Sequence, residues 1–209
     1  MKGLAYKTVW VEYPDIGPLY KKLGMKETHT RENGEPLYSL PAIHDPKTGK
    51  SVPDSLQIVE YLDETYPGNG PILMPKGTHA FYQAFLAALD TVLSPNYWNI
   101  VMDLQFAVLN PPSQEWWNKV KVWEKGVDQK LGFEDTEKSF KVIEKWYKPG
   151  EKYIGGNEIV LADLHIAGLL VWIRALWGKD SPEWANVLTW NNGRWSHLLD
   201  NLSKYEQVL

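Results

Sequence analysis

The stretch from Leu40 to Pro67, LPAIHDPKTGKSVPDSLQIVEYLDETYP, constrains the fold of this chain more than any other. Two short runs, Pro41–His44 and Lys50–Val52, flank a turn with Pro and Gly where tight turns favour them. In Ser55–Thr65 the apolar residues recur at helical spacing, and acidic residues fall on the opposite face. We therefore expect a strand, a turn, a second strand and a helix in direct succession.

Asp54 and Ser55 lie at the expected junction between the second strand and the helix. The first turn of a helix has backbone N–H groups without intrahelical partners, and the helix dipole favours negative charge there. The junction is therefore a candidate binding site for a small anion. A plain N-cap is the alternative role, since Asp and Ser are both common caps. One pair of residues can serve both roles.

The sequence before this stretch predicts further short elements. Tyr6–Tyr13 alternates polar and apolar residues and is rich in β-formers, which predicts a strand. Ile16–Leu23 predicts a short helix that Gly24 ends. Glu27–Glu35 is polar and contains an Asn-Gly turn signal, so we expect a loop there.

After Pro67 the composition changes from strands and turns to helices. Tyr66–Pro71 stops the preceding helix and has the composition of a linker. Leu161–Trp177 is apolar nearly all round, which indicates a buried central helix. Two further helices are expected to begin at a capping residue: Thr78 caps one with Phe81, Phe85, Leu89 and Val92 on one stripe, and Ser113 caps one with Trp116, Val120, Trp123 and Val127 at core spacing. Between them we expect a helix over Tyr97–Leu109, after an interruption at Pro95. The remaining expected helices are Glu134–Tyr147, one that starts at Ser181, and a last one with Trp195 and Leu202.

The fold class predicted from these patterns is α/β plus all-α. An α/β region at residues 1–67 is followed by a linker at residues 68–77 and an all-α region at residues 78–209. With 209 residues, of which 44% are hydrophobic, the chain is long enough to bury a sizeable core.

Charge and residue usage exclude several classes of protein. The formal net charge is -4 and no long run of Lys or Arg occurs, which argues against nucleic acid as a partner. The absence of cysteine excludes disulfides, thiolate zinc sites and a catalytic thiol supplied by this chain. No run approaches the ~18 apolar residues of a membrane span, and the N-terminus has no signal-peptide core. We expect a cytoplasmic protein with no membrane partner.

The histidines and aromatic residues give weaker indications. No two of the five histidines are spaced as metal ligands are, so no metal is expected. His165 is expected to be a core histidine. His44 and Asp45 could form an acid–base pair. The favoured interpretation is structural: His44 ends a strand and Asp45 belongs to the turn. Tyr97 and Trp98 are candidate walls of an apolar pocket, with core packing as an equal alternative.

The succession LPAI, PDS and IVEYLDETYP, followed by helices, resembles the glutathione transferase superfamily over nearly the whole chain. Two further stretches, AYKTVWVEYPDI and SPEWANVLTWNNGRWSHLLDNLSKY, resemble fungal glutathione transferases related to the bacterial β-aryl etherases. The resemblance implies a thioredoxin-like domain that binds glutathione, then a helical domain that covers a second, apolar substrate. It also implies a homodimer and a role in detoxification.

The resemblance assigns glutathione-binding roles to four residues. Leu40 precedes Pro41, which matches the cis-proline of the family, and the Leu40 backbone would pair with the cysteinyl part of glutathione. Asp54 and Ser55 match the acidic residue and the serine that hold the γ-glutamyl end. Glutathione is therefore the expected co-substrate, and a hydrophobic small molecule is the expected second ligand.

The sequence departs from the family pattern in two places. The central helix of the family's second domain has a Ser or Thr cap three residues before an Asp. Here Asp163 matches the Asp, but Val160 stands at the cap, a loss of about 1 kcal/mol if nothing replaces it. The family's first strand and helix, whose junction carries the residue that activates the thiol, are expected to be missing, because Gly3 resembles a helix end without its helix. An incomplete gene model, a deliberate cut or a natural degenerate form would each explain this truncated thioredoxin-like domain.

Two functions follow from these observations. The first is a glutathione transferase that conjugates glutathione to a hydrophobic aromatic electrophile, or cleaves that electrophile by thiolate attack. No residue is assigned a catalytic role, so weak or no activity is expected of this chain. The alternative is a non-catalytic, ligandin-like binder of aromatic small molecules, or a protein-interaction module.

Overall fold

The computed structural model describes residues 1–31, 34–93, 96–120 and 129–206. None of the helices in these ranges is long and apolar enough to cross a membrane. The predicted interruption at Pro95 and the predicted core positions Trp123 and Val127 lie outside the described residues.

The chain divides into two compact units. The first holds Met1–Met74 together with Asn110–Val120, and the second holds Pro75–Leu109 together with the described part of Lys121–Val208. The described strands all lie in the first unit, and the described elements of the second unit are helical. The expected succession of a small α/β domain and an all-helical domain is therefore confirmed.

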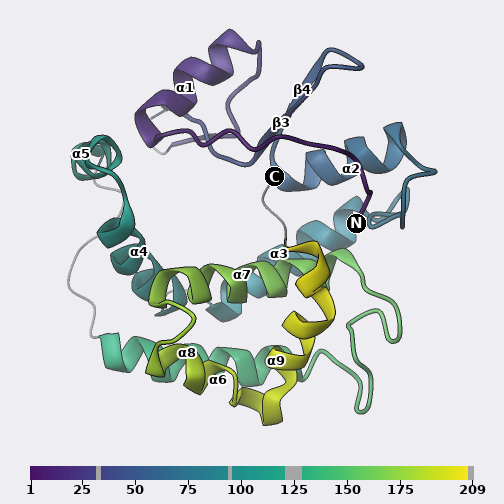
Figure 1. Cartoon of the computed structure of the whole chain (residues 1–209), viewed down its shortest axis with the longest axis vertical. Coiled ribbons are helices and arrows are strands. Elements are labelled where there is room, and N and C mark those ends of the chain that lie inside the picture. The colour runs from purple at the N-terminus through teal and green to yellow at the C-terminus, as the bar shows by residue number, and fades with distance from the viewer. Residues whose placement is uncertain (32–33, 94–95, 121–128, 207–209) are drawn as a thin grey trace. The chain divides into compact units, whose positions relative to one another are not determined.

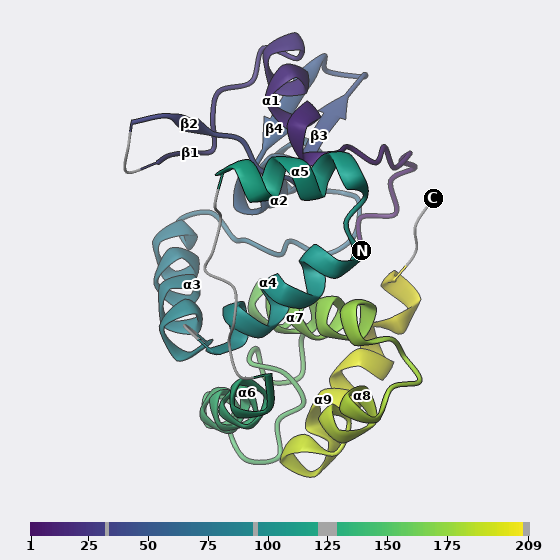
Figure 2. The same cartoon turned by 90° about the vertical axis from the view of Figure 1, so that its left-hand side faces the viewer.

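The strands of the first unit form two antiparallel hairpins (Figure 1 and Figure 2). In one, β1 (His29–Thr30) pairs with β2 (Pro36–Leu37), and in the other, β3 (Ala42–Asp45) pairs with β4 (Lys50–Pro53). The hairpin expected from the central stretch is confirmed. The loop expected over Glu27–Glu35 is partly wrong, because β1 lies within it.

Helix α2 follows the second hairpin directly and spans Ser55–Thr65, the predicted bounds. Helix α1 (Tyr13–Lys22) begins before the predicted Ile16, because Pro14 lies in its first turn, where the missing N–H of proline costs nothing. Each helix turns an apolar stripe inward, as the periodicity predicts; Ile16 and Tyr20 are buried in α1.

The strand expected over Tyr6–Tyr13 is wrong. Among the described residues this segment pairs with no strand, and Tyr13 is the first residue of α1. Alternating β-formers show only that a segment would suit a pleated surface, whereas a strand also needs a neighbour for its backbone groups. The side chains of Val9 and Trp10 are accordingly 71% and 82% exposed.

Helix α5 (Pro111–Val120) belongs to the first unit and lies beside α1 (Figure 2). The ring of Tyr13 stacks on Trp116 at a centroid distance of 5.1 Å and meets Trp117 edge-on at 4.9 Å. Such aromatic pairs add about 0.5–1.5 kcal/mol each to the gain from burial. Two segments far apart in sequence are thereby joined in one unit.

The predicted capping role of Ser113 is wrong. Helix α5 begins at Pro111, so Ser113 lies inside the first turn and is buried. Its hydroxyl donates to the Glu12 carboxylate and accepts from the backbone N–H of Tyr13 at 3.0 Å. These bonds join α5 to the start of α1, which the local sequence could not show.

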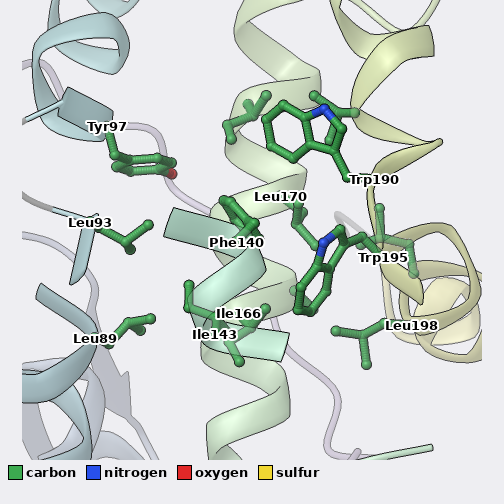
Figure 3. Packing of buried hydrophobic residues seen from close by; sticks show 14 of the residues in the cluster. Leu89, Leu93, Tyr97, Phe140, Ile143, Ile166, Leu170, Trp190, Trp195 and Leu198 are labelled. Atoms are coloured by element: carbon green, nitrogen blue, oxygen red, sulfur yellow. The ribbon is translucent and has the colours of Figure 1, made fainter. Parts of the chain in front are cut away.

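The second unit packs its helices around a core rich in aromatic residues (Figure 3). Phe140, Ile166 and Trp195 are all 0% exposed, and the rings of Phe140 and Trp195 meet edge-on at 5.2 Å. Each such side chain contributes about 1.5–3 kcal/mol by burial. The helices are α3 (His79–Leu93), α4 (Asn96–Val108), α6 (Gln129–Glu144), α7 (Leu161–Trp177), α8 (Pro182–Val187) and α9 (Trp190–Leu202), followed by the 3₁₀ turn η1 (Ser203–Tyr205).

The outcome at the predicted helix starts differs from helix to helix. Ser181 caps α8 by accepting the N–H of Trp184 at 3.1 Å, as predicted. The Thr78 hydroxyl instead donates to the carbonyl of Pro75 at 2.6 Å, so the predicted side-chain cap of α3 is wrong. Phe81 is 76% exposed, which contradicts its predicted place on the inward stripe of α3.

Candidate functional site

The junction between the second hairpin and α2 brings the four predicted site residues together. The peptide bond between Leu40 and Pro41 is cis, and it lies just before β3. Residue Ala42 pairs with Pro53, so Pro41 lies opposite the end of β4. The N–H of Asp54 donates to the carbonyl of Pro41 at 3.2 Å. This bond fastens the start of the hairpin to the start of the helix.

Asp54, and not Ser55, is the N-cap of α2. Its carboxylate oxygen Oδ1 accepts the N–H groups of Leu56 at 3.0 Å and Gln57 at 3.2 Å. The backbone of Asp54 has a φ of 67°, in the left-handed region that Asp tolerates better than most residues. Two of the N–H groups that were expected to face a ligand are therefore bound within the protein.

Two groups at the junction keep hydrogen-bonding capacity. Within the described ranges, neither the backbone N–H and C=O of Leu40 nor the hydroxyl of Ser55 has a hydrogen-bond partner. Leu40 is 42% exposed. A peptide group and a hydroxyl beside the positive end of a helix dipole can hold an extended peptide that carries a carboxylate.

The nearby hydroxyls of Tyr20 and Ser39 are already committed as donors. Tyr20 is 0% exposed, and its hydroxyl donates to the carbonyl of Ser39. Burial raises the pKa of Tyr20, and the negative charge of Asp54 raises it further. The hydroxyl of Thr28 donates to the carbonyl of Leu37 at 2.9 Å, so Ser39 must be the donor in the 2.9 Å bond between the Ser39 and Thr28 hydroxyls. Neither the Tyr20 hydroxyl nor the Ser39 hydroxyl is therefore available as a hydrogen-bond donor to a thiolate.

Asp45, which the sequence offered only as a turn residue or as a partner of His44, has different partners in the structure. Its carboxylate accepts the hydroxyls of Tyr61 and Tyr66, which belong to the end of α2. His44 does not join it, because its Nδ1 lies 3.0 Å from the hydroxyl of Ser51 on the neighbouring strand. The acid–base pair is therefore not formed, and Asp45 fastens the turn. An Asp in a turn does not indicate which residues it will bind, so the local sequence could not have predicted its hydrogen bonds to the two tyrosines.

The other sequence candidates contribute no site in the described ranges. Tyr97 is 1% exposed and its hydroxyl donates to the carbonyl of Leu169 at 3.2 Å, so it packs in the core. The side chain of Trp98 lies outside the described part. His165 is half-buried, with its Nδ1 3.3 Å from the carbonyl of Leu161. No group of three or more His, Asp or Glu side chains in the described ranges could hold a metal ion.

A hollow of about 550 Å³ lies in the second unit. Charged side chains line much of it, including Glu144, Glu151, Lys152 and Arg194. Arg194 is already engaged, because it donates to Glu144 at 3.4 Å and to the carbonyl of Glu151 at 3.2 Å and lies over the ring of Tyr147 at 4.7 Å.

Comparison with known families agrees with the fold. The family model described as the N-terminal domain of glutathione S-transferase matches residues 1–70. The model described as the C-terminal domain matches residues 80–205.

Similar proteins occur among fungal glutathione transferases. A glutathione S-transferase of Ceriporiopsis subvermispora, solved in complex with glutathione, is 35% identical; the match covers 100% of this chain and 87% of that chain, with a TM-score of 0.90. Glutathione transferase GSTFuA3 of Phanerochaete chrysosporium is 31% identical over 100% of this chain and 86% of its own, with a TM-score of 0.89.

The glutathione S-transferase-like protein ustS of Aspergillus flavus is 37% identical over 99 residues. That match covers 45% of this chain and 33% of ustS, so this chain spans about a third of that relative's length. The two family models together account for most of the chain, and the fungal structures match all of it. This chain belongs to the glutathione S-transferase family.

Proposed function

We propose that this chain binds glutathione at the junction of β3, β4 and α2. The backbone of Leu40 pairs with the cysteinyl part of the ligand, beside the cis bond to Pro41. The hydroxyl of Ser55 and the N-terminus of α2 bind the γ-glutamyl carboxylate. Asp54 attracts the γ-glutamyl ammonium through Oδ2, since Oδ1 is used by the N-cap. The observation that supports this most is the bond from Asp54 to Pro41, because it ties the residue after Leu40 to the residue before Ser55.

Calorimetry with glutathione tests the proposal. Asp54→Ala would remove both the charge and the N-cap, so Asp54→Asn is the sharper change: Asn caps helices well and tolerates positive φ. We expect Asp54→Asn combined with Ser55→Ala to raise the Kd at least ~10-fold, about 1.4 kcal/mol. The control is Asp15→Asn, which removes an exposed carboxylate from α1 of the same unit. An unchanged Kd in the double variant would count against this site.

The reaction that fits the family is attack of the glutathione thiolate on a hydrophobic aromatic electrophile, by conjugation or by ether cleavage. A thiol with a pKa near ~8.5 is mostly protonated at neutral pH, so turnover needs a donor that stabilises the thiolate. The protons of Tyr20 and Ser39 are committed elsewhere. We therefore expect slow turnover of a generic aryl halide. Steady-state rates close to those of the fungal relatives, measured side by side, would contradict this.

A non-catalytic binder of aromatic small molecules, or a protein-interaction module, is the second candidate. The observation that favours it is the exposure of Trp10, which is 82%. Binding of an aromatic dye without binding of glutathione would favour this function over the first.

A cytoplasmic homodimer with a role in fungal detoxification remains our expectation, and light scattering of the purified protein tests the dimer.

A further inference from the structure

Asp45 lies at the turn end of β3, and Pro41 precedes the other end of that strand. Its Oδ2 accepts the hydroxyl of Tyr61 at 2.5 Å and the hydroxyl of Tyr66 at 2.6 Å, while Oδ1 accepts the backbone N–H of Lys47 at 2.9 Å. Tyr61 lies in the second half of α2 and Tyr66 is its C-cap. We name these three side chains, Asp45, Tyr61 and Tyr66, the Asp45 clamp. The clamp fastens the tip of the hairpin to the far end of α2.

Neighbouring groups reinforce the clamp. The proton of Tyr61 goes to Asp45, so Thr48 must be the donor in the 2.6 Å bond between the Thr48 and Tyr61 hydroxyls. The Lys47 ammonium lies 5.5 Å from the centroid of the Tyr66 ring, within the range of a cation–π contact. The tyrosine hydrogen bonds lower the pKa of Asp45 to about 2, and the same contact raises the pKa of Tyr66 to about 12. Asp45 therefore stays ionised and Tyr66 stays protonated throughout the physiological range.

The hairpin and α2 are thus joined at two points. The chain itself joins them at Asp54, and the clamp joins them at the opposite end. Figure 1 shows the hairpin of β3 and β4 beside α2. Leu40 lies on the strand side of the junction and Ser55 lies on the helix side. Helix α2 also packs against β3 and β4, and the clamp adds a second fixed connection that helps to set the angle between the hairpin and the helix. A ligand that touches both sides depends on that angle.

We propose that Asp45 is a positioning residue for glutathione: through Tyr61 and Tyr66 it holds the N-terminus of α2 at the spacing from Leu40 that the ligand requires. This inference rests on the glutathione site proposed above. Asp45 itself touches no ligand, so its effect on affinity is indirect. Preorganisation of this kind lowers the cost of binding without adding a contact.

Three variants weaken the clamp to different degrees. Asp45→Ala removes it, Asp45→Asn keeps an acceptor oxygen of similar size, and Tyr66→Phe removes one hydroxyl and keeps the ring. We expect the Kd for glutathione to rise roughly ten-fold in Asp45→Ala, less in Asp45→Asn, and least in Tyr66→Phe. In the Asp45→Ala background, Tyr66→Phe should have little further effect, because the two residues act as one unit.

Two controls separate positioning from general destabilisation. Glu64→Gln removes an exposed charge from the same helix. Ser181→Ala removes the N-cap of α8, which lowers stability in the other unit without touching the junction. Calorimetry is run well below the unfolding midpoint of every variant, and both controls should bind glutathione as the unmodified chain does.

Each outcome decides the inference. A graded rise in Kd with unchanged controls supports it. Equal Kd values for the unmodified chain and Asp45→Ala overturn it, as do fully additive effects of Asp45→Ala and Tyr66→Phe. If Asp45→Ala does not fold, Tyr66→Phe decides, and an unchanged Kd there overturns the inference. If the unmodified chain binds no glutathione, the proposed function fails and the positioning role fails with it.

Discussion

The buried carboxylate of Asp163 offers a quantitative test of what holds the helical unit together. Asp163 is 0% exposed and lies in the first turn of α7. Its Oδ1 accepts the N–H of Ile154 at 2.9 Å and its Oδ2 accepts the N–H of Val160 at 3.0 Å, while the hydroxyl of Tyr147 lies at 3.4 Å. One side chain therefore ties the loop before α7 to the helix itself.

Asp163→Ala removes both acceptors at once. An unsatisfied buried donor costs about 1–3 kcal/mol, and we take the lower end for each N–H because Ile154 and Val160 are only half-buried. The favourable interaction of a carboxylate with the helix N-terminus adds about 0.5 kcal/mol. The sum is a loss of about 2.5 kcal/mol in the free energy of unfolding. Asp163→Asn keeps one acceptor oxygen and should lose about half as much.

Urea denaturation followed by far-UV circular dichroism measures these losses. The control is Asp180→Ala, an exposed carboxylate near the end of α7 that should change stability by less than about 0.5 kcal/mol. The m-value must stay constant for the comparison to hold. If Asp163→Ala unfolds within about 0.5 kcal/mol of the unmodified chain, the two backbone bonds do not carry the stability assigned to them.

Three further predictions concern stability. Val160→Thr should stabilise the chain by about 0.5–1 kcal/mol in the same urea assay, because Val160 gives α7 no side-chain cap. The N–H of Asp163 now donates to the carbonyl of Val160 at 3.0 Å, and a hydroxyl at residue 160 would offer it a second acceptor. No gain in stability would mean that this carbonyl alone satisfies the N–H. Lys2→Met should destabilise the folded chain by about 3 kcal/mol, because the Lys2 ammonium lies 2.7 Å from the buried carboxylate of Asp63 and its removal leaves that charge unpaired. Thermal denaturation measures the loss, with Lys2→Arg as the control. Equal unfolding midpoints for the Met and Arg variants would refute this. The pKa of Asp45 is lowered to about 2, so the stability that Asp45 contributes is present above its unfolded pKa near ~4 and is lost as pH falls from about 4 to about 2. Asp45→Asn should flatten the stability curve in that window, and an unchanged curve would contradict the assignment.

The fold was predictable where the deciding contacts are local. The bounds of α2 and α7 follow from periodicity and from the residues that end each helix, and both agree with the structure. The failures lie where a distant segment decides. Tyr6–Tyr13 suits a strand but has no partner among the described residues, and α5 joins the first unit through the rings of Trp116 and Trp117 against α1. No window of sequence contains both sides of such a contact.

The site shows the same division between local and distant causes. The pattern around Leu40 and Asp54 located the junction, because a hairpin followed at once by a helix leaves few arrangements of those residues. It did not show that one carboxylate oxygen of Asp54 caps α2, which leaves only the other oxygen for a ligand. Nor did it show the Asp45 clamp, whose tyrosines come about two and more than three helical turns after Asp54. The residues that form the junction are therefore readable from local sequence, while the groups that fasten the hairpin to α2 are set by contacts across the fold.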